Sequence, residues 1–244
     1  MDFSILNDYS FIELKLLCSK MSIEHSKNKT ETIDKLTMAF REYEEYKNDI
    51  EQKYTRIEQL GDPGKEGITY LVRDKSENEY AMKTFKKSKS HETLRKEAVL
   101  QQKASVLGVA PVILEYDTVS KFIVMEKMDK SFIDIIRKQK GIVTKNQQKQ
   151  IINLFQKLDE CKVFHGDANI MNYMQKGKRL YMIDYGFSKE ITPKFIKLYK
   201  TETPNMKIML LGLILKLKEL RCNPISWELL ITYISEEDKI KCDL

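Results

Sequence analysis

The chain has 244 residues, of which 42% are hydrophobic and 32% are charged, as expected of a globular protein with an apolar core. Its 9 Gly and 5 Pro exclude a collagen-like or low-complexity chain, and its 4 widely spaced Cys with 3 His argue against a disulfide framework or a zinc site. The net charge is +6, but residues 1–50 hold 7 Lys and Arg against 10 Asp and Glu, so the basic character belongs to the remainder.

The first fifty residues predict two short helices around the polar segment Ser22–Lys29. Asn28 is a candidate N-cap of the second helix, with Glu31 at the third position. The charged stretch 41–53 then predicts a solvated helical connector. The apolar residues at helical spacing are Phe11, Leu14, Leu17 and Cys18 before the polar segment, and Ile33, Leu36 and Phe40 after it.

From Tyr54 the pattern changes to short β-rich segments with one helix, and after Lys127–Lys130 it is mostly helical. This order indicates an α+β fold with two lobes. The predicted strands are Tyr54–Leu60, Ile68–Arg73, Glu79–Phe85, Val112–Tyr116 and Lys121–Met125, and the predicted helices are His91–Lys103, Ser131–Gln139, Lys145–Cys161 and Pro204–Leu220.

No segment of the sequence predicts a membrane span or a secretory signal. The most apolar run, Ile208–Leu215, is too short to cross a bilayer and predicts a buried helix. The N-terminal Met-Asp-Phe-Ser lacks a basic stretch followed by an apolar core. We therefore expect a cytoplasmic or nuclear protein without membrane contact.

Two features of the strand-rich part fit nucleotide binding. Residues 60–72 (LGDPGKEGITYLV) place three glycines between two predicted strands, where a backbone without Cβ atoms can approach a phosphate. A glycine-bearing hairpin turn is the alternative interpretation. Tyr80-Ala-Met-Lys83 then puts a lysine in an apolar strand, and Glu97 in the following helix is a candidate acidic partner.

The strongest motif is VFHGDANIMN at residues 163–172, followed by MIDYGF at residues 182–187. Together they have the pattern H-x-D-x-x-x-x-N and then D-aromatic-G. Phosphoryl transfer requires a carboxylate near the attacking hydroxyl and oxygen ligands for Mg²⁺, and Asp167, Asn172 and Asp184 supply these groups. Each alone is compatible with a buried structural role, but this spacing, downstream of the glycine loop and the lysine, favours a phosphoryl-transfer site.

Residues 54–190 resemble the protein-kinase-like fold, with its motifs in order. The resemblance implies a bilobal α+β protein with an N-lobe at 54–127 and a shortened helical C-lobe at 128–244. A helical module at 1–46 and a connector at 47–53 would precede it. The implied cofactors are ATP and Mg²⁺.

The resemblance also implies a role for each motif residue. Asp167 would be the catalytic base, with Asn172 beside it. Asn172 and Asp184 would hold Mg²⁺, and Lys83, itself held by Glu97, would bind the α- and β-phosphates. The other implied residues are Gly61, Gly64, Lys65 and Gly67 of the glycine loop, Ala81 over the adenine, Met125 as gatekeeper, Glu126 and Met128 of the hinge, and His165 as packing support for the Asp-Tyr-Gly turn.

Several positions depart from the family pattern. The arginine that usually follows the motif histidine is Gly166, and the lysine that usually touches the γ-phosphate is Asn169. No Ala-Pro-Glu motif follows Asp184, and Lys207 stands where the aspartate of the loop-anchoring helix is expected. We therefore expect no regulation by activation-loop phosphorylation. These features resemble the compact atypical kinases: the RIO group, through Gly64-Lys-Glu66, the small kinase of the KEOPS complex, and predicted kinases of large DNA viruses.

Residues 11–40 resemble a SAP motif, a helix–loop–helix module associated with DNA binding. Lys27, Lys29 and Lys35 would meet DNA phosphates near the start of the second helix. A helical hairpin that docks on a partner is the alternative, because the segment is net acidic and lacks the usual turn glycine.

The leading hypothesis is a kinase that transfers the γ-phosphoryl group to Ser or Thr of a protein substrate. A small-molecule kinase is an alternative, because His-Gly-Asp also occurs in aminoglycoside- and choline-kinase-like enzymes, although Asp184-Tyr-Gly186 favours the protein-kinase side. A nucleotide-binding pseudokinase scaffold that recruits DNA or a partner through residues 1–45 is a third. The resemblance to viral kinases would place the chain in a host cell or a virion. The oligomeric state is not indicated.

Overall fold

The computed structural model describes residues 3–21 and 23–244, with the side chains of these residues except 5, 20 and 43–51. Ser22, the first residue of the predicted polar segment, lies outside the described residues. The chain divides into two compact units, Met1–Ile57 with Val72–Asn78 and Glu58–Leu71 with Glu79–Leu244.

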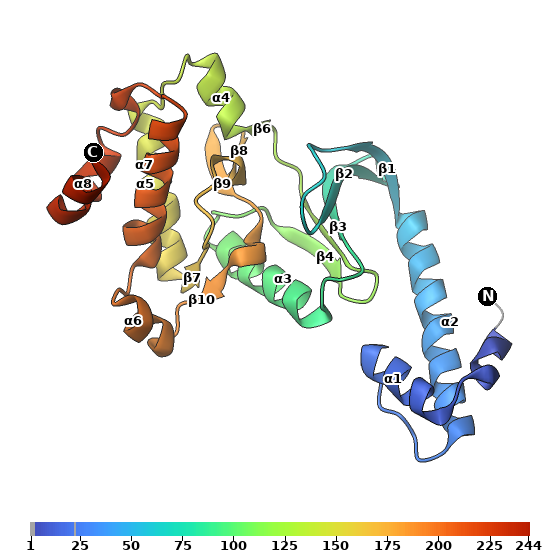
Figure 1. The fold of residues 1–244 in the computed structure, drawn as a ribbon. Helices are drawn as coiled ribbons and strands as arrows, with labels where there is room; N and C mark the ends of the chain where they lie inside the picture. The colour runs from blue at the N-terminus through green and yellow to red at the C-terminus, as the bar shows by residue number, and fades with distance from the viewer. Residues whose placement is uncertain (1–2, 22) are drawn as a thin grey trace. The chain divides into compact units, whose positions relative to one another are not determined.

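The first unit contains the helices η1 (Phe3–Asp8), α1 (Phe11–Met21) and α2 (Lys29–Lys53) (Figure 1). Leu14, Cys18 and Leu36 are fully buried between them, so the apolar spacing is confirmed. Asn28 caps α2 as predicted, because its Oδ1 accepts a hydrogen bond from the Glu31 amide at 2.8 Å. The predicted second helix and connector form one continuous helix, since no Gly or Pro interrupts residues 29–53.

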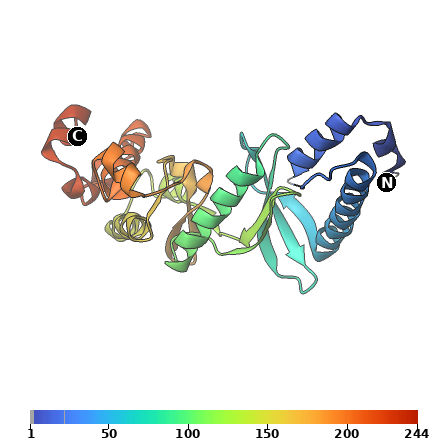
Figure 2. The ribbon, with the colours of Figure 1, turned by 90° about the horizontal axis from the view of Figure 1, so that it is seen from below.

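Five strands form one sheet in the order β1-β2-β3-β5-β4, in which β5 pairs antiparallel with both β3 and β4. Helix α3 (His91–Val106) covers this sheet in the view of Figure 2, with Leu94 and Ala98 packed against Ile123 and Met125. The strands are β1 (Tyr54–Gln59), β2 (Gly67–Asp74), β3 (Glu79–Phe85), β4 (Ile113–Asp117) and β5 (Phe122–Glu126), the last two beginning one residue later than predicted.

The rest of the second unit is mainly helical, around a core to which α5 (Lys145–Glu160) contributes an apolar face and α7 (Leu210–Glu219) several buried leucines. The remaining helices are α4 (Phe132–Lys138), η2 (Ile170–Asn172), η3 (Tyr185–Phe187), α6 (Pro193–Tyr199), η4 (Asn205–Met209), η5 (Pro224–Ser226), η6 (Leu230–Tyr233) and α8 (Glu236–Cys242). The short strands β6 (Lys130–Ser131), β8 (Tyr173–Lys176) and β9 (Arg179–Met182) form one small sheet, and β7 (Val163–Phe164) with β10 (Lys189–Glu190) another.

The predicted helix Pro204–Leu220 begins differently in the structure, with the π-helical turn η4 before α7. The strands between residues 161 and 204 escaped the sequence analysis because two to four residues are too few for an alternating pattern.

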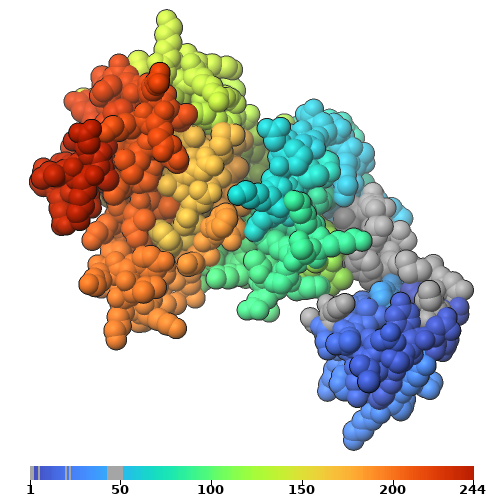
Figure 3. Space-filling model, viewed as in Figure 1, coloured from blue at the N-terminus to red at the C-terminus, as the bar shows by residue number. Residues whose placement is uncertain are grey.

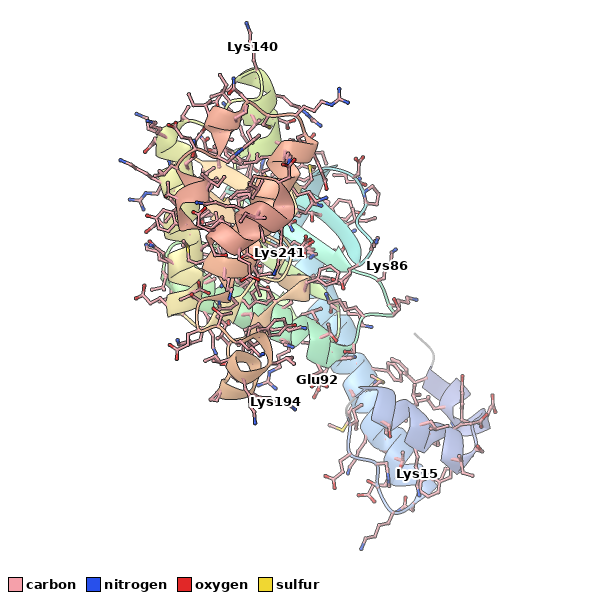
Figure 4. All side chains as sticks on the ribbon, turned by 60° about the vertical axis from the view of Figure 1, so that its left-hand side comes forward. Lys15, Lys86, Glu92, Lys140, Lys194 and Lys241 are labelled. Atoms are coloured by element: carbon pink, nitrogen blue, oxygen red, sulfur yellow. The ribbon has the colours of Figure 1, made fainter. Side chains whose placement is uncertain are left out.

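The predicted α+β class, a kinase-like fold with a short helical C-lobe after a small helical module, is confirmed. None of the helices in the described part of the chain is long and apolar enough to cross a bilayer. Helix α8 lies on the outside of the second unit (Figure 3), and no residue in it is buried. The side chains of Lys86, Lys140 and Lys194 point into solvent (Figure 4), so part of the basic charge is ordinary surface charge.

Candidate active site

Lys83 lies at the centre of the candidate site. Strand β3 carries it opposite Ile123 of β5, and its side chain is only 13% exposed. Its Nζ lies 2.8 Å from Glu97 Oε1 on α3 and 2.8 Å from Asp184 Oδ1 at the start of η3. Burial alone would lower the pKa of Lys83, but the two carboxylates outweigh it and hold that pKa above its usual value. Lys83 is therefore a fixed cation that joins three elements.

Asp184 remains open to solvent on one side, with 46% of its side chain exposed. Its backbone has φ +64°, a left-handed conformation that turns the chain into η3, and its Oδ1 accepts a hydrogen bond from the Gly186 amide at 3.4 Å. Burial would raise the pKa of this carboxyl, but Lys83 and the Gly186 bond lower the pKa below its usual range. An ionised, partly exposed carboxylate beside a lysine can bind a cation.

Glu97 is held by a second lysine that the motif analysis missed. Lys89 Nζ lies 2.5 Å from Glu97 Oε2 and 2.5 Å from Glu66 Oε2 of the glycine loop. The side chains of Lys89 and Glu97 are 4% and 2% exposed. Charges therefore alternate through five residues, in the order Glu66, Lys89, Glu97, Lys83, Asp184.

The glycine loop lies tightly against β3. The Gly64 amide donates to Gly67 O at 2.8 Å, and a Cβ atom at Gly67 would lie 2.1 Å from Thr84 O. Gly61 has φ +70°, which glycine adopts without strain. The Lys65 side chain is exposed.

Residues implied to bind adenine lie together at the other end of β3. Ala81 and Met125 are cross-strand partners, and both are buried. Gln101 of α3 contacts Met125 Sδ at 3.5 Å. The Glu126 amide donates to Val112 O at 2.9 Å, so this N–H is already used within the protein. Met128 is also buried.

Both carboxylate oxygens of Asp167 accept hydrogen bonds from residues of the same loop. Asn172 Nδ2 donates to Asp167 Oδ2 at 2.9 Å, and the Asn169 amide donates to Asp167 Oδ1 at 3.0 Å. Because Nδ2 of Asn172 is turned to Asp167, Oδ1 is the amide atom left to bind a cation. Carboxylate and amide oxygens are the hard ligands that Mg²⁺ prefers, so Asn172 and Asp184 fit this ion chemically.

His165 is fully buried beneath this loop and packs as expected. Its Nε2 lies 3.0 Å from Ile183 O, and its ring meets Tyr185 edge-on at 4.9 Å. Burial lowers the pKa of His165, against the smaller effect of its bond to Ile183, and favours the neutral ring.

The loop is anchored two residues before the position that the family pattern indicates. Lys207 is exposed, and the His165 amide donates instead to Asn205 Oδ1 at 3.1 Å. Asn205 is fully buried at the start of η4. The register differs because the predicted helix starts with a π-helical turn, which the apolar pattern alone does not reveal.

The N-terminal segment keeps its predicted lysines at the surface. Lys27, Lys29 and Lys35 are exposed, and Lys29 Nζ donates to Asn7 O at 2.9 Å. No finding tests the likeness of residues 11–40 to a SAP motif, so DNA binding there stays a prediction.

No protein-family model matches the sequence. The chain is similar to proteins named probable bifunctional tRNA threonylcarbamoyladenosine biosynthesis proteins in three archaea. The identity is 31% over 125 residues in Methanosarcina mazei, 30% over 127 residues in Methanosarcina acetivorans and 30% over 125 residues in Methanosarcina barkeri. These matches cover 51%, 52% and 51% of the chain, but only 22% of each relative. The matched half of the chain therefore spans only about a fifth of the length of these relatives.

Proposed function

We propose that the chain is an ATP- and Mg²⁺-dependent kinase that transfers the γ-phosphoryl group to a Ser or Thr hydroxyl of a protein. The observation that carries the proposal is the position of Lys83, 2.8 Å from both Glu97 and Asp184. A lysine fixed between a helix carboxylate and a metal-binding carboxylate is the arrangement that nucleotide phosphates require in kinases. The names of the relatives point to tRNA threonylcarbamoyladenosine biosynthesis and name no protein substrate.

In such a reaction each residue of the site would have its own role. ATP with Mg²⁺ supplies the transferable phosphoryl group and neutralises its charge. Lys83 would hold the phosphates, and Asn172 and Asp184 would hold the cation. Asp167, oriented by Asn172, would accept the proton of the attacking hydroxyl. With these groups held beforehand by buried partners, catalysis would come mainly from positioning.

A second candidate is a nucleotide-dependent role in tRNA threonylcarbamoyladenosine biosynthesis, which the names of the relatives favour. In that role ATP would be turned over without stable labelling of a protein. The small-molecule kinase and the pseudokinase scaffold remain further alternatives.

One experiment separates these functions. The full chain is incubated with γ-labelled ATP and Mg²⁺, with a generic protein substrate or with tRNA, beside Lys83→Ala and Asp184→Ala. Lys87→Ala is the matched control, because Lys87 is an exposed lysine close to the site in sequence. The protein-kinase function is supported if the protein substrate is labelled by wild type and by Lys87→Ala but not by Lys83→Ala or Asp184→Ala. Phosphate release that tRNA stimulates would favour the second candidate. Bound ATP without turnover would overturn the proposed function and favour the scaffold.

A further inference from the structure

The glycine loop and helix α3 are joined by a buried ion-pair bridge. Lys89, between β3 and α3, lies 2.5 Å from Glu66 of the loop and 2.5 Å from Glu97 of the helix. Its side chain is 4% exposed, and its Nζ lies 4.6 Å from the centre of the Phe85 ring. A buried ammonium group is costly unless it is paired, and here Glu66 and Glu97 both pair with it.

The bridge uses the oxygen of Glu97 that Lys83 leaves free. Lys83 binds Oε1 and Lys89 binds Oε2, so the carboxylate cannot rotate without breaking one of the two pairs. The orientation of the carboxylate that holds Lys83 thus depends on Lys89.

The same bridge brings the loop over the turn that carries Asp184. A Cβ atom at Gly186 would lie 2.8 Å from Glu66 Oε2 and 3.4 Å from Glu97 Oε2. The Glu66 carbonyl also accepts the Lys86 amide at 2.8 Å, so both backbone and side chain tie this residue down. Glu66 itself is 38% exposed, which makes it the weaker end of the bridge.

We propose that Lys89 is a positioning residue that couples closure of the glycine loop to the Lys83–Glu97 ion pair. The inference rests on the proposed function, because it assigns the loop to nucleotide binding. With the bridge in place, the loop and the phosphate-binding lysine are ordered before ATP arrives, and binding does not have to order them. Without it, Glu66 is released to solvent and Glu97 keeps one partner instead of two.

The test is a double-mutant cycle with Glu66→Gln and Lys89→Met in the full chain. Each single variant should weaken ATP binding about tenfold, because each removes a charge-assisted hydrogen bond from the bridge. The double variant should be no weaker than Lys89→Met, since the two residues act through one contact. Lys103→Met is the matched control: like Lys89, Lys103 pairs with a glutamate, Glu190, but this pair is exposed to solvent, and its removal should leave ATP affinity unchanged.

A second readout needs no nucleotide. Amide hydrogen exchange of residues 61–67 should become faster in Glu66→Gln and Lys89→Met and stay unchanged in Lys103→Met. Because Glu66 is partly exposed, Glu66→Gln should do this without lowering the melting temperature, which a general loss of folding would lower. Additive effects on ATP affinity, tighter binding by Glu66→Gln, or unchanged exchange in the loop would each overturn the coupling. Absence of ATP binding by the wild-type chain would overturn the proposed function instead, and the exchange experiment would still decide on the bridge.

Discussion

Asn205→Asp should be one of the most damaging single substitutions in the second unit, although it changes one atom. The Asn205 amide makes three hydrogen bonds in a fully buried position: Nδ2 donates to Asp159 Oδ1 at 2.7 Å and to Val163 O at 2.8 Å, and Oδ1 accepts from the His165 amide at 3.1 Å. Asp159 also accepts the Asn205 and Met206 amides, so it caps the start of η4. A carboxylate at 205 still accepts the hydrogen bond from the His165 amide. It has no N–H to donate to Asp159 or to Val163 O, so it places an acceptor against each of these two acceptors.

The size of the effect follows from these contacts. Two carboxylates at hydrogen-bond distance cannot both stay ionised, so one must take up a proton. Holding a proton at pH 7 on a carboxyl whose ordinary pKa is about 4 costs about 4 kcal/mol. Leaving Val163 O without a donor adds about 1 kcal/mol or more. We therefore expect a loss of about 5 kcal/mol at pH 7, which would lower the melting temperature by roughly 10–20 °C in a chain of this size.

The pH dependence gives the sharper test. The new carboxyl has a raised pKa in the folded state, so the folded protein binds a proton that the unfolded chain releases. Stability is then regained as the pH falls, by about 1.4 kcal/mol for each unit between pH 7 and about pH 4. Urea unfolding followed by the fluorescence of Trp227, the single tryptophan, measures this in the unit that holds Asn205. A loss below about 1 kcal/mol, or one that does not change with pH, would refute the assigned amide orientation.

Gln148→Glu is the matched control for Asn205→Asp. Gln148 is also fully buried and also uses its amide three times, with Val143 O, Ile225 O and the Leu229 amide. The same amide-to-acid change should cost comparable stability there. Only Asn205→Asp should also slow phosphoryl transfer, about 100-fold with ATP affinity unchanged, because its contacts hold the strand that leads into Asp167. Equal losses of rate in both variants would show that the effect is general instability.

Two further substitutions probe the site and its pH dependence. Gly67→Ala should cost about 3 kcal/mol or more in urea unfolding, because its Cβ would lie 2.1 Å from the Thr84 backbone oxygen. Gly108→Ala, with open space around it, should cost only about 1–2 kcal/mol for its positive φ. Equal losses would contradict the close packing of the loop. His165→Asn should make the free energy of unfolding less dependent on pH below about pH 6.5. In the wild-type chain burial lowers the pKa of His165, so on acidification the unfolded chain takes up the proton first. The wild-type free energy of unfolding therefore falls by up to about 1.4 kcal/mol per pH unit, and the variant lacks this loss. An unchanged slope in the variant would assign the acid sensitivity to other groups.

The motif residues were predictable because their spacing constrains them. Lys83, Glu97 and Asp184 come from a strand, a helix and a turn, and the structure brings all three to one point. Lys89 was not predictable in the same way, since it belongs to the polar run KKSKS, which is typical of a solvent-exposed loop. Its burial arises from the chain reversal between β3 and α3, which carries it back over Phe85. Burial of a charged residue is a tertiary property that local pattern does not record.

Asn205, which anchors the loop that contains Asp167, was also not predictable from the local sequence pattern. The apolar run after Pro204 correctly predicts a buried helix, but it carries no information on which polar residue faces the loop. Asn205 faces it because the helix opens with a π-helical turn and because Asp159, in the last turn of α5, binds its amide. Only the packing of α5 against η4 brings these two residues together.

The absence of the usual arginine after His165 has a steric cause in this chain. Gly166 has φ +82°, and a Cβ atom there would lie 2.7 Å from Phe187 O, so no side chain fits without moving the backbone after the Asp-Tyr-Gly turn. An arginine at this position would normally bind a phosphorylated residue and order the turn. Here the turn is held from within, by Lys83 on Asp184 and by the His165 ring on Tyr185. The Asp-Tyr-Gly turn is therefore held by contacts within the fold, and in the proposed kinase it needs no arginine at residue 166.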